Sequence, residues 1–512
     1  MKPVSPWRWI PTLYFAQGLP YVVVMTLSVV MYKNLGVSNT LITLYTSWLY
    51  LPWVIKPLWS PLVELLGAKR RWIVGLQFAI GVAFALVALT LPAPKFLQLS
   101  LAMFWLMAFA SATHDIAADG FYLLALPQRA QAAFVGVRST FYRLSMLGGQ
   151  GGLVYLAGWL AERHGSVVLA WSWVFGLLAA LFAAAALAHL WLLPRPVADL
   201  PAPRRSGGAA VFWRDFFAVF AAFFRRRDIG RILAFLLLYR FAEAQLLKLV
   251  TPFLLDARAD GGLGLSTQDV GIAYGTVGVA ALTLGGLLGG WVISRGGLKR
   301  LLWPLMICMH APNVLFVLLA LWQPQSLLIV SAALAVEQFG YGFGFTAYMV
   351  FMLMVASSGD EAGAEAGAHK RAGNGVSASL NDTPQTARQT AAPAVQQTAH
   401  QTGHETGHRK GHQTGHPTGH PTTPQTADPI EHPTAHQTEH PVANQTAHYA
   451  LCTGFMALGM MLPGMWAGWL QDRLGYADFF IWGCIATIPS FIAAALVRID
   501  PLFGRRTEQP AG

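Results

Sequence analysis

Three ionisable side chains, His114, Asp115 and Asp119, interrupt the apolar segment Phe109-Ala-Ser-Ala-Thr-His-Asp-Ile-Ala-Ala-Asp-Gly-Phe121. The surrounding apolar run begins near Leu97 and is long enough to cross a bilayer, which takes about 20 residues of α-helix. Asp115 and Asp119 share one face of a helix because they are four residues apart. A carboxylate in hydrocarbon is costly, so that face points into a bundle interior or a watery cavity. Both acids are therefore functional candidates; the alternative is a structural pair held by basic groups of a neighbouring helix.

The composition of the whole chain is that of a membrane protein. Of its 512 residues, 54% are hydrophobic and only 12% are charged, and the mean hydropathy is +0.46. An ordinary soluble domain carries about 25% charged residues. The chain offers about twelve apolar runs of spanning length, and Gly and Pro recur within them, as in transporter helices. We predict an all-α membrane protein with about twelve transmembrane helices.

The basic residues follow the rule that positive charge gathers on the cytoplasmic side of a membrane protein. The net charge of +11 comes from short clusters between the apolar runs, so it does not indicate a nucleic-acid partner. We read the N-terminus as the first span and not as a signal peptide. The charge asymmetry then predicts that both termini lie in the cytoplasm of a multi-pass protein of the inner (plasma) membrane. The clusters on the predicted inner side are Lys2 with Arg8, 69–71, Arg129, 225–227, 295–300 and Arg505 with Arg506.

The chain divides into two similar halves. Gly158-Trp-Leu-Ala-Glu-Arg-His-Gly165 resembles Gly468-Trp-Leu-Gln-Asp-Arg-Leu-Gly475, an offset of 310 residues (468 minus 158). The basic pairs 69–70 and 299–300 differ by only 230 (299 minus 69), so a segment of roughly 80 residues is inserted in the second half. The predicted units are an N-terminal six-helix half (1–193), a cytoplasmic linker with an amphipathic stretch (194–230), four helices (231–356), a low-complexity loop (357–447), two helices (448–498) and a cytoplasmic tail (499–512).

The inserted loop is rich in His, Gly, Thr, Gln and Pro. Such a segment buries no core, so we expect it to be disordered on the cytoplasmic side. Histidines recur every four residues from His400 to His420. On a helix they would form a metal-binding stripe, but the interspersed Pro and Gly oppose a persistent helix. Weak Zn²⁺ or Ni²⁺ binding and a neutral expanded repeat both remain open.

Two six-helix halves, each with a basic turn after its second span, resemble the major facilitator superfamily. The turn pattern of that family, Gly-x-x-x-Asp-Arg-x-Gly-Arg-Arg, matches Gly290-Trp-Val-Ile-Ser-Arg-Gly-Gly-Leu-Lys-Arg300 except that Ser294 replaces the acid. In the first half Glu64 holds the position of the acid. The resemblance implies that these turns gate the transporter, with Glu64, Arg70 and Arg295 as gating residues.

Within that superfamily the chain is similar to the AmpG-type muropeptide permeases and their peptide/acetyl-coenzyme A/drug transporter relatives. The resemblance implies proton-driven import of an anionic sugar-peptide such as an anhydromuropeptide. His114 stands where those permeases have Gln, and the turn after the second span is altered, which leaves another cargo open. The segments that carry the resemblance are Phe15-Ala-Gln-Gly-Leu-Pro20, Lys56-Pro-Leu-Trp-Ser-Pro61, Ala112-Thr-His-Asp-Ile-Ala-Ala-Asp119, Tyr142-Arg-Leu-Ser-Met-Leu-Gly-Gly149 and Glu337-Gln-Phe-Gly-Tyr-Gly-Phe-Gly344.

An anionic sugar-peptide requires fixed cations for its carboxylates and polar or aromatic groups for its sugar. Arg143 and Arg240 are deep enough in their spans to reach the centre, and arginine grips a carboxylate with two hydrogen bonds. The further binding candidates are Arg138, Lys56, Gln17 and Tyr142. Lys56, next to a proline, is equally a gate candidate, and helix packing also explains the aromatic residues.

Proton coupling requires a buried carboxyl group or histidine that gains and loses a proton. Glu337 has no nearby cation in the sequence, whereas Glu243 is three residues from Arg240 and is expected to neutralise it in the structural alternative. The histidine at 114 is either a proton relay or a satisfied hydrogen-bonding group. The full set of proton-coupling candidates is Asp115, Asp119, Glu337, Glu243 and His114.

Other function classes fit the sequence less well. A transporter of another solute, such as a drug, a nucleotide-like molecule or a metal cation collected by the His-rich loop, is the alternative to muropeptide transport. The spans contain no nucleophile motif, no Walker loop and no metal triad, so we expect no enzyme activity, no cofactor and no resident metal. The expected partners are a small-molecule substrate and the lipid bilayer, and the expected oligomeric state is a monomer.

Overall fold

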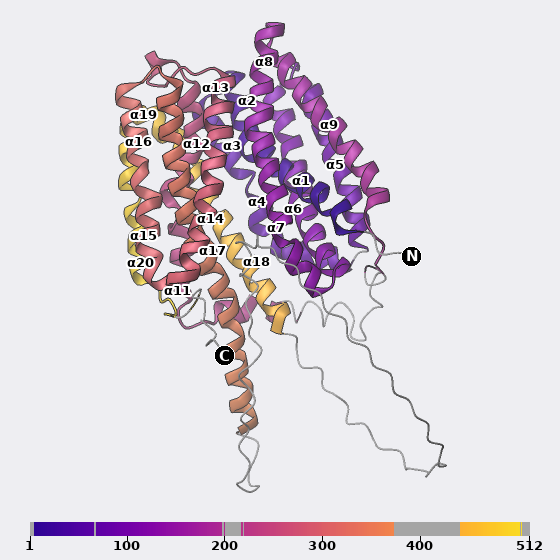
Figure 1. Cartoon of the computed structure of the whole chain (residues 1–512). Helices are drawn as coiled ribbons and strands as arrows, with labels where there is room; N and C mark the ends of the chain where they lie inside the picture. The colour runs from indigo at the N-terminus through magenta and orange to yellow at the C-terminus, as the bar shows by residue number, and fades with distance from the viewer. Residues whose placement is uncertain are drawn as a thin grey trace, which may run out of the picture.

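The computed structural model describes residues 5–65, 68–196, 199, 214, 217–218, 220–372, 441–501 and 503. Every regular element within these ranges is a helix. The helices form two bundles that stand side by side, one from each half of the chain (Figure 1). The all-α fold with two halves, predicted from the sequence, is therefore confirmed.

The six expected spans of the N-terminal half are all present, several of them as consecutive helices. The first combines α1, the π-helical turn η2 and α2, the second combines α3 and α4, and the fifth combines α7, the π-helical turn η3 and α8. The bounds are α1 Ile10–Val22, η2 Val23–Leu27, α2 Ser28–Asn34, α3 Asn39–Trp48, α4 Leu51–Leu65, α5 Lys69–Thr90, α6 Phe96–Ala125, α7 Gln128–Leu147, η3 Gly148–Leu153, α8 Val154–His164 and α9 Val167–Leu192.

The C-terminal half repeats this plan. In α19, Gly475 has a positive φ of 78°, which a residue without a Cβ adopts most easily, and there the chain turns from the eleventh span into the twelfth. The bounds are α11 Ile229–Leu238, α12 Phe241–Leu255, η5 Arg258–Asp260, α13 Thr267–Val270, η6 Gly271–Gly278, α14 Val279–Gly296, α15 Leu298–His310, η7 Ala311–Asn313, α16 Val314–Trp322, α17 Leu327–Ala372, α18 Pro441–Met465, α19 Ala467–Ile485 and α20 Ile488–Leu496.

By length and hydropathy alone, 8 helices of the described chain are candidate membrane spans. The second and seventh expected spans fall outside this group, since each is divided near its middle, at Leu49–Tyr50 and at Tyr239–Arg240. The fifth, which carries Arg138 and Arg143, and the eleventh, which is mainly α18, also fall outside it. In the second, fifth and seventh spans, breaks or charged residues weaken the apolar signal.

The inserted loop lies mostly outside the described residues, including all of its histidines from His400 to His420. The flanking helices reach further into it than the sequence pattern indicated. Helix α17 continues to Ala372, and α18 begins at Pro441. The segment expected to lack structure, 357–447, therefore has a helical backbone at both ends.

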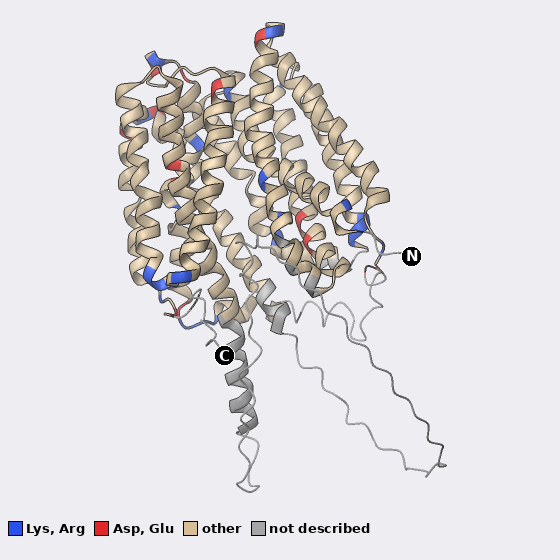
Figure 2. Ribbon diagram, viewed as in Figure 1, with Lys and Arg blue, Asp and Glu red and all other residues tan. Residues whose placement is uncertain are grey.

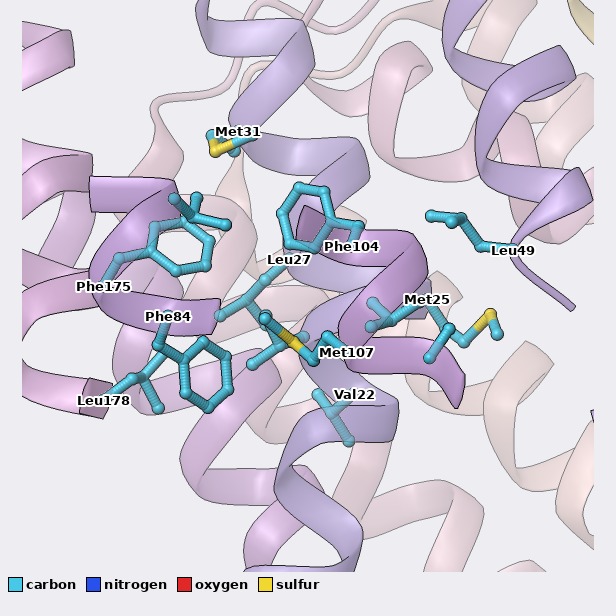
Figure 3. Packing of buried hydrophobic residues seen from close by; sticks show 14 of the residues in the cluster. Val22, Met25, Leu27, Met31, Leu49, Phe84, Phe104, Met107, Phe175 and Leu178 are labelled. Atoms are coloured by element: carbon cyan, nitrogen blue, oxygen red, sulfur yellow. The ribbon is translucent and has the colours of Figure 1, made fainter. Parts of the chain in front are cut away.

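The core of the N-terminal bundle is built from aromatic and sulfur-containing side chains. Phe84, Phe104 and Phe175 come from three helices and are all fully buried. The Phe104 and Phe175 ring centroids lie 5.9 Å apart at an angle of 61°, an edge-on contact (Figure 3). Met25 and Met107 fill the space beside them. Most of this core comes from the N-terminal half, and Ala457 of α18 joins it from the C-terminal half.

The halves meet closely where two glycine-rich π-helical turns cross. A Cβ atom on Gly275 of η6 would lie only 2.1 Å from the carbonyl oxygen of Gln150 in η3, and one on Gly151 would lie 2.6 Å from Thr276 Oγ1. Only glycine permits this approach, and π-helical turns are frequent at functional sites. The halves also meet where α18 and α19 pack against α3 and α4, and where α13 packs against α8.

The basic turns lie at the same end of both bundles. Lys and Arg gather where α5 and α15 begin (Figure 2). The Leu298 N–H at the start of α15 donates to Phe503 O, so the C-terminal end of the described chain lies beside this turn. Much of the amphipathic linker stretch lies outside the described residues. Phe223, within it, is fully buried and stacks on Phe455 with centroids 6.3 Å apart. This part of the linker packs under the C-terminal half and does not lie apart from it.

Candidate transport site

Asp119 and Arg138 form an ion pair inside the N-terminal half. Arg138 Nη2 lies 2.8 Å from Asp119 Oδ1, and Tyr14 donates a longer bond of 3.4 Å to the same oxygen. The Arg138 guanidinium also lies over the rings of Tyr14 and Tyr122, at 4.6 and 5.5 Å. The spacing of Asp115 and Asp119 gave no sign that only Asp119 has this partner. Arg138 is held by protein groups, which leaves it less available to cargo than the other cations.

Asp115 has a different environment from Asp119 although both share a helix face. Trp53 Nε1 donates to Asp115 Oδ2 over 3.2 Å. Gln17 and Lys56 also interact electrostatically or by hydrogen bonding with this carboxylate. The Lys56 ammonium, however, is not within ion-pair distance of Asp115. Tyr142 interacts electrostatically with both acids. Four of the predicted residues, Asp115, Lys56, Gln17 and Tyr142, are therefore brought together.

His114 faces away from this group. It is buried between α5, α6 and α9, with its Nε2 3.1 Å from Gln77 Nε2. Gln77 Oε1 in turn lies 2.8 Å from His189 Nδ1, and His189 Nε2 lies 3.0 Å from Thr12 Oγ1. His114 is thus a hydrogen-bonded core histidine, and the structure does not bring it together with Asp115 and Asp119.

Arg240 lies at the break between α11 and α12, near the middle of its span. Its side chain is buried, its Nη2 donates to the Tyr341 hydroxyl, and the guanidinium lies 4.8 Å from the centre of the Phe345 ring. It interacts electrostatically with Tyr21 and Tyr50, which belong to the N-terminal half. Within the described ranges no carboxylate lies at ion-pair distance from it.

Arg143 is the corresponding cation of the N-terminal half. A Cβ atom on Gly286 of α14 would lie 3.5 Å from Arg143 Nη2, so the arginine reaches the C-terminal half. It too has no acidic partner among the residues whose side chains are described. Arg143 and Arg240 therefore each extend from their own half toward the other.

Glu243 does not neutralise Arg240, contrary to the structural alternative drawn from their spacing. Its Oε1 lies 2.7 Å from His310 Nδ1, and both side chains are only 3% exposed. His310 is distant in the sequence and comes from the end of α15, so no local pattern indicated this pair. Glu337 is also buried, and Gln338 Nε2 donates to its Oε2 over 2.9 Å. No cation within the described ranges is at ion-pair distance from Glu337.

The gating candidates lie at the basic end. Arg70 donates to the carbonyl oxygens of Leu190 and Leu193 at the end of α9. Asp199 accepts bonds from the Lys69 and Arg70 backbone N–H groups, which places a carboxylate at the N-terminus of α5. Arg295 lies 4.0 Å from the centre of the Trp291 ring. The side chain of Glu64 lies outside the described part of the chain.

A polar network joins the halves at the opposite end, which the sequence analysis missed. We call Lys33, Asn39, Asp256, Gln471 and Tyr476 the Asp256 network. Lys33 pairs with Asp256, whose Oδ2 also accepts from the Tyr476 hydroxyl at 2.5 Å and from Asn39 Nδ2 at 3.3 Å. Asn39 Nδ2 donates to Gln471 Oε1 at 2.8 Å as well. The network joins three segments that are far apart in sequence, 33–39, Asp256 and 471–476, so only folding brings them together.

The network has further contacts around it that also cross between the halves. Thr40 donates to Asp472, and the Gly468 N–H donates to Thr43 Oγ1 over 3.0 Å. Asn34 Nδ2 donates to Thr267 Oγ1 over 2.9 Å. The halves are therefore closed on each other at the end opposite the basic turns.

Two halves of six spans, with central cations and one closed end, form the arrangement of an alternating-access transporter. The sequence family Major Facilitator Superfamily matches residues 12–380 of this chain. The chain belongs to the major facilitator superfamily. Its membership makes it a membrane transporter, as the resemblance of the basic turns and the AmpG-type segments predicted.

The chain is similar in sequence to a permease and to a putative transporter from other bacteria. The anhydromuropeptide permease of Escherichia coli strain K12 is 29% identical over 362 residues, which is 68% of this chain and 68% of that protein. The putative transporter AmpG 4 of Rickettsia conorii is 25% identical over 348 residues, which is 65% of this chain and 78% of that protein.

Solved structures of other superfamily members share the fold. The nucleoside transporter NupG has a TM-score of 0.56 at 14% identity, and the match covers 97% of this chain and 100% of that one. A POT family transporter in complex with a thioalcohol conjugated peptide has a TM-score of 0.57 at 11% identity, with 94% of each chain covered. At these identities the likeness extends to the fold alone.

Proposed function

We propose that this transporter imports an anionic solute of the anhydromuropeptide type across the inner membrane, coupled to protons, with both termini in the cytoplasm. The observation that carries the proposal is the pair Arg143 and Arg240. Each extends from its own half toward the other, and neither has an acidic partner within the described ranges. Two such cations form a site whose missing counter-charge is supplied by cargo.

The groups around Arg240 suit a sugar-peptide. The Tyr341 hydroxyl accepts a hydrogen bond from its guanidinium, and Tyr21 and Tyr50 interact with it electrostatically. Tyrosine offers both an apolar ring and a polar hydroxyl. Ligand sites combine such rings with a few fixed polar groups that set orientation. The relatedness to the anhydromuropeptide permease of Escherichia coli supports this cargo class.

Glu337 is the proton-carrier candidate that the structure favours. It is buried, its described hydrogen-bond partner is the neutral amide of Gln338, and it lies near a second acid, Glu243. A carboxyl group in such a place gains and loses a proton as its access to water alternates. Asp119 is less suited to this role, because Arg138 holds it as an ion pair.

The test is uptake of labelled anhydromuropeptide into vesicles with an imposed inward proton gradient. We expect uptake that collapses when a protonophore is added. Arg240→Gln removes a charged hydrogen-bonding group worth about 1.5 to 3 kcal/mol, so uptake at low cargo concentration should fall roughly 10- to 150-fold. Arg163→Gln is the matched control, since Arg163 is exposed on the surface over Trp159, and should transport normally.

Glu337→Gln separates coupling from binding. We expect it to lose uptake driven by the proton gradient and to retain exchange of labelled for unlabelled cargo, because exchange needs no net proton movement. Asp478→Asn, at an exposed acid, is its control. Folded wild-type protein that takes up no anhydromuropeptide would refute the proposed cargo. Uptake that persists with the protonophore would refute the proton coupling.

A further inference from the structure

Lys248 is a buried cation of α12 that the site described so far does not use. Its side chain is 3% exposed. Its Nζ donates to Thr46 Oγ1 over 3.0 Å and lies 5.1 Å from the centre of the Tyr50 ring. Both partners belong to the N-terminal half, so Lys248 reaches across the interface between the halves. No carboxylate of the described chain lies at ion-pair distance from it.

The contacts of Lys248 leave hydrogen-bonding capacity unused. An ammonium group has three donors, and a hydroxyl and an aromatic face compensate only part of the cost of burying a charge. Ser47 Oγ is also buried without a hydrogen-bond partner. Both side chains lie against Gly464 of α18, where a Cβ atom would be 2.7 Å from Ser47 Oγ and 3.4 Å from Lys248 Cγ. The Lys248 ammonium and the Ser47 hydroxyl therefore lie close together, and each has hydrogen-bonding capacity that the described contacts do not fill.

The position of Lys248 relates it to Arg240 and to the Asp256 network. Arg240, Lys248 and Asp256 follow one another at intervals of eight residues, and eight residues of helix rise about 12 Å. Lys248 thus lies between the central arginine and the closed end. Tyr50 neighbours both cations, since it lies under the Lys248 ammonium and interacts electrostatically with Arg240.

We propose that Lys248 forms a second anion subsite beside the site of Arg143 and Arg240, so that the transporter selects cargo that carries two anionic groups, one bound at the arginine site and the other by Lys248. This inference rests on the proposed function. Arg240 and Lys248 both interact with Tyr50, so two anionic groups of one cargo molecule can reach them together.

The alternating cycle explains why Lys248 contacts Thr46 and Tyr50 in this conformation. In this cycle, opening of the Asp256 network moves Thr46 of α3 and Tyr50, which follows α3, away from α12 and removes both contacts of the ammonium. The group is then free to bind one carboxylate of the cargo that enters from the opened end, while the other anionic group of the cargo goes on to Arg240. Closure returns the Thr46 hydroxyl and the Tyr50 ring to the ammonium and releases the anion.

The test compares two labelled probes that differ by one charge. The first is the anhydro-disaccharide carrying L-alanyl-D-glutamate, which has two free carboxylates, and the second carries L-alanyl-D-isoglutamine, which has one. Uptake of both is measured at low concentration in vesicles that contain the wild type, Lys248→Met or Lys248→Arg. Lys95→Met, at an exposed loop lysine, is the control. Thermal unfolding confirms that each variant is folded.

The wild type should prefer the doubly charged probe. Loss of one charged hydrogen-bonding contact predicts that Lys248→Met lowers uptake of that probe about tenfold or more, while it leaves uptake of the singly charged probe nearly unchanged. Lys248→Arg should keep the preference. An equal loss for both probes in Lys248→Met would overturn the second subsite and leave the proposed function standing. A wild type that takes up neither probe would overturn the proposed function, and this inference with it.

Discussion

The Asp256 network predicts that one substitution opens the transporter at its closed end. Asp256→Asn keeps the size of the side chain but removes the charge that pairs with Lys33 and accepts from Tyr476 and Asn39. The side chains of Lys33 and Asp256 are only 15% and 17% exposed, so solvent screens their interaction less than that of a surface pair. The closed conformation loses this stabilisation and the open one does not.

The size of the effect follows from the contacts that are lost. A hydrogen bond to a charged group contributes about 1.5 to 3 kcal/mol, and Asn39 retains its bond to Gln471. We therefore expect a loss of about 2 to 4 kcal/mol for the closed state relative to the open one, which corresponds to roughly 30- to 900-fold in their population ratio.

Cysteine accessibility measures this ratio directly. Ser47 is fully buried beneath the network, so Ser47→Cys reports when the closed end opens. The three native cysteines, Cys308, Cys452 and Cys484, are first replaced by serine. A membrane-impermeant thiol reagent, added from the side of the Asp256 network, should label Asp256→Asn much faster than the parent protein.

The control is Asp260→Asn, which removes an exposed acid from the neighbouring η5 turn without touching the network. Its labelling rate should equal that of the parent. In a double-mutant cycle, Lys33→Gln should have a smaller effect after Asp256→Asn than before it, because the pair is already broken. An unchanged labelling rate in folded Asp256→Asn protein would refute the reasoning.

Two further predictions concern packing and the N-terminal polar network. Gly275→Ala places a Cβ atom 2.1 Å from Gln150 O at the crossing of the halves. This overpacking should lower the free energy of unfolding by about 1 to 3 kcal/mol and reduce uptake. Gly152→Ala, whose Cβ atom would have no atom within 4 Å, should leave both the unfolding temperature and uptake unchanged. His189→Leu leaves Gln77 Oε1 without its hydrogen-bond partner at 2.8 Å. This substitution should destabilise the fold by about 1 to 3 kcal/mol, which a lower unfolding temperature would show. Uptake per folded molecule should persist. Uptake lost at an unchanged unfolding temperature would instead indicate a proton relay through His189.

The candidate site was partly predictable from the sequence. Arg143, Arg240 and Glu337 stand out because a charge within an apolar run is costly and needs a reason. The same signal also selected His114 and Arg138, which the fold uses within the N-terminal bundle. A sequence gives the depth of a side chain along a span, but the direction in which it points depends on how its helix packs.

The sequence alone was enough to predict a membrane protein, its two halves and its family. Hydropathy, basic clusters and repeated segments are local properties of the chain that can be seen without its structure. The tertiary structure decided the partners of the charges. Glu243 pairs with His310 and not with nearby Arg240, and Lys33 meets Asp256. Both pairs join segments that are far apart in the chain, and the packing of the helices, which no sequence spacing encodes, brings their side chains together.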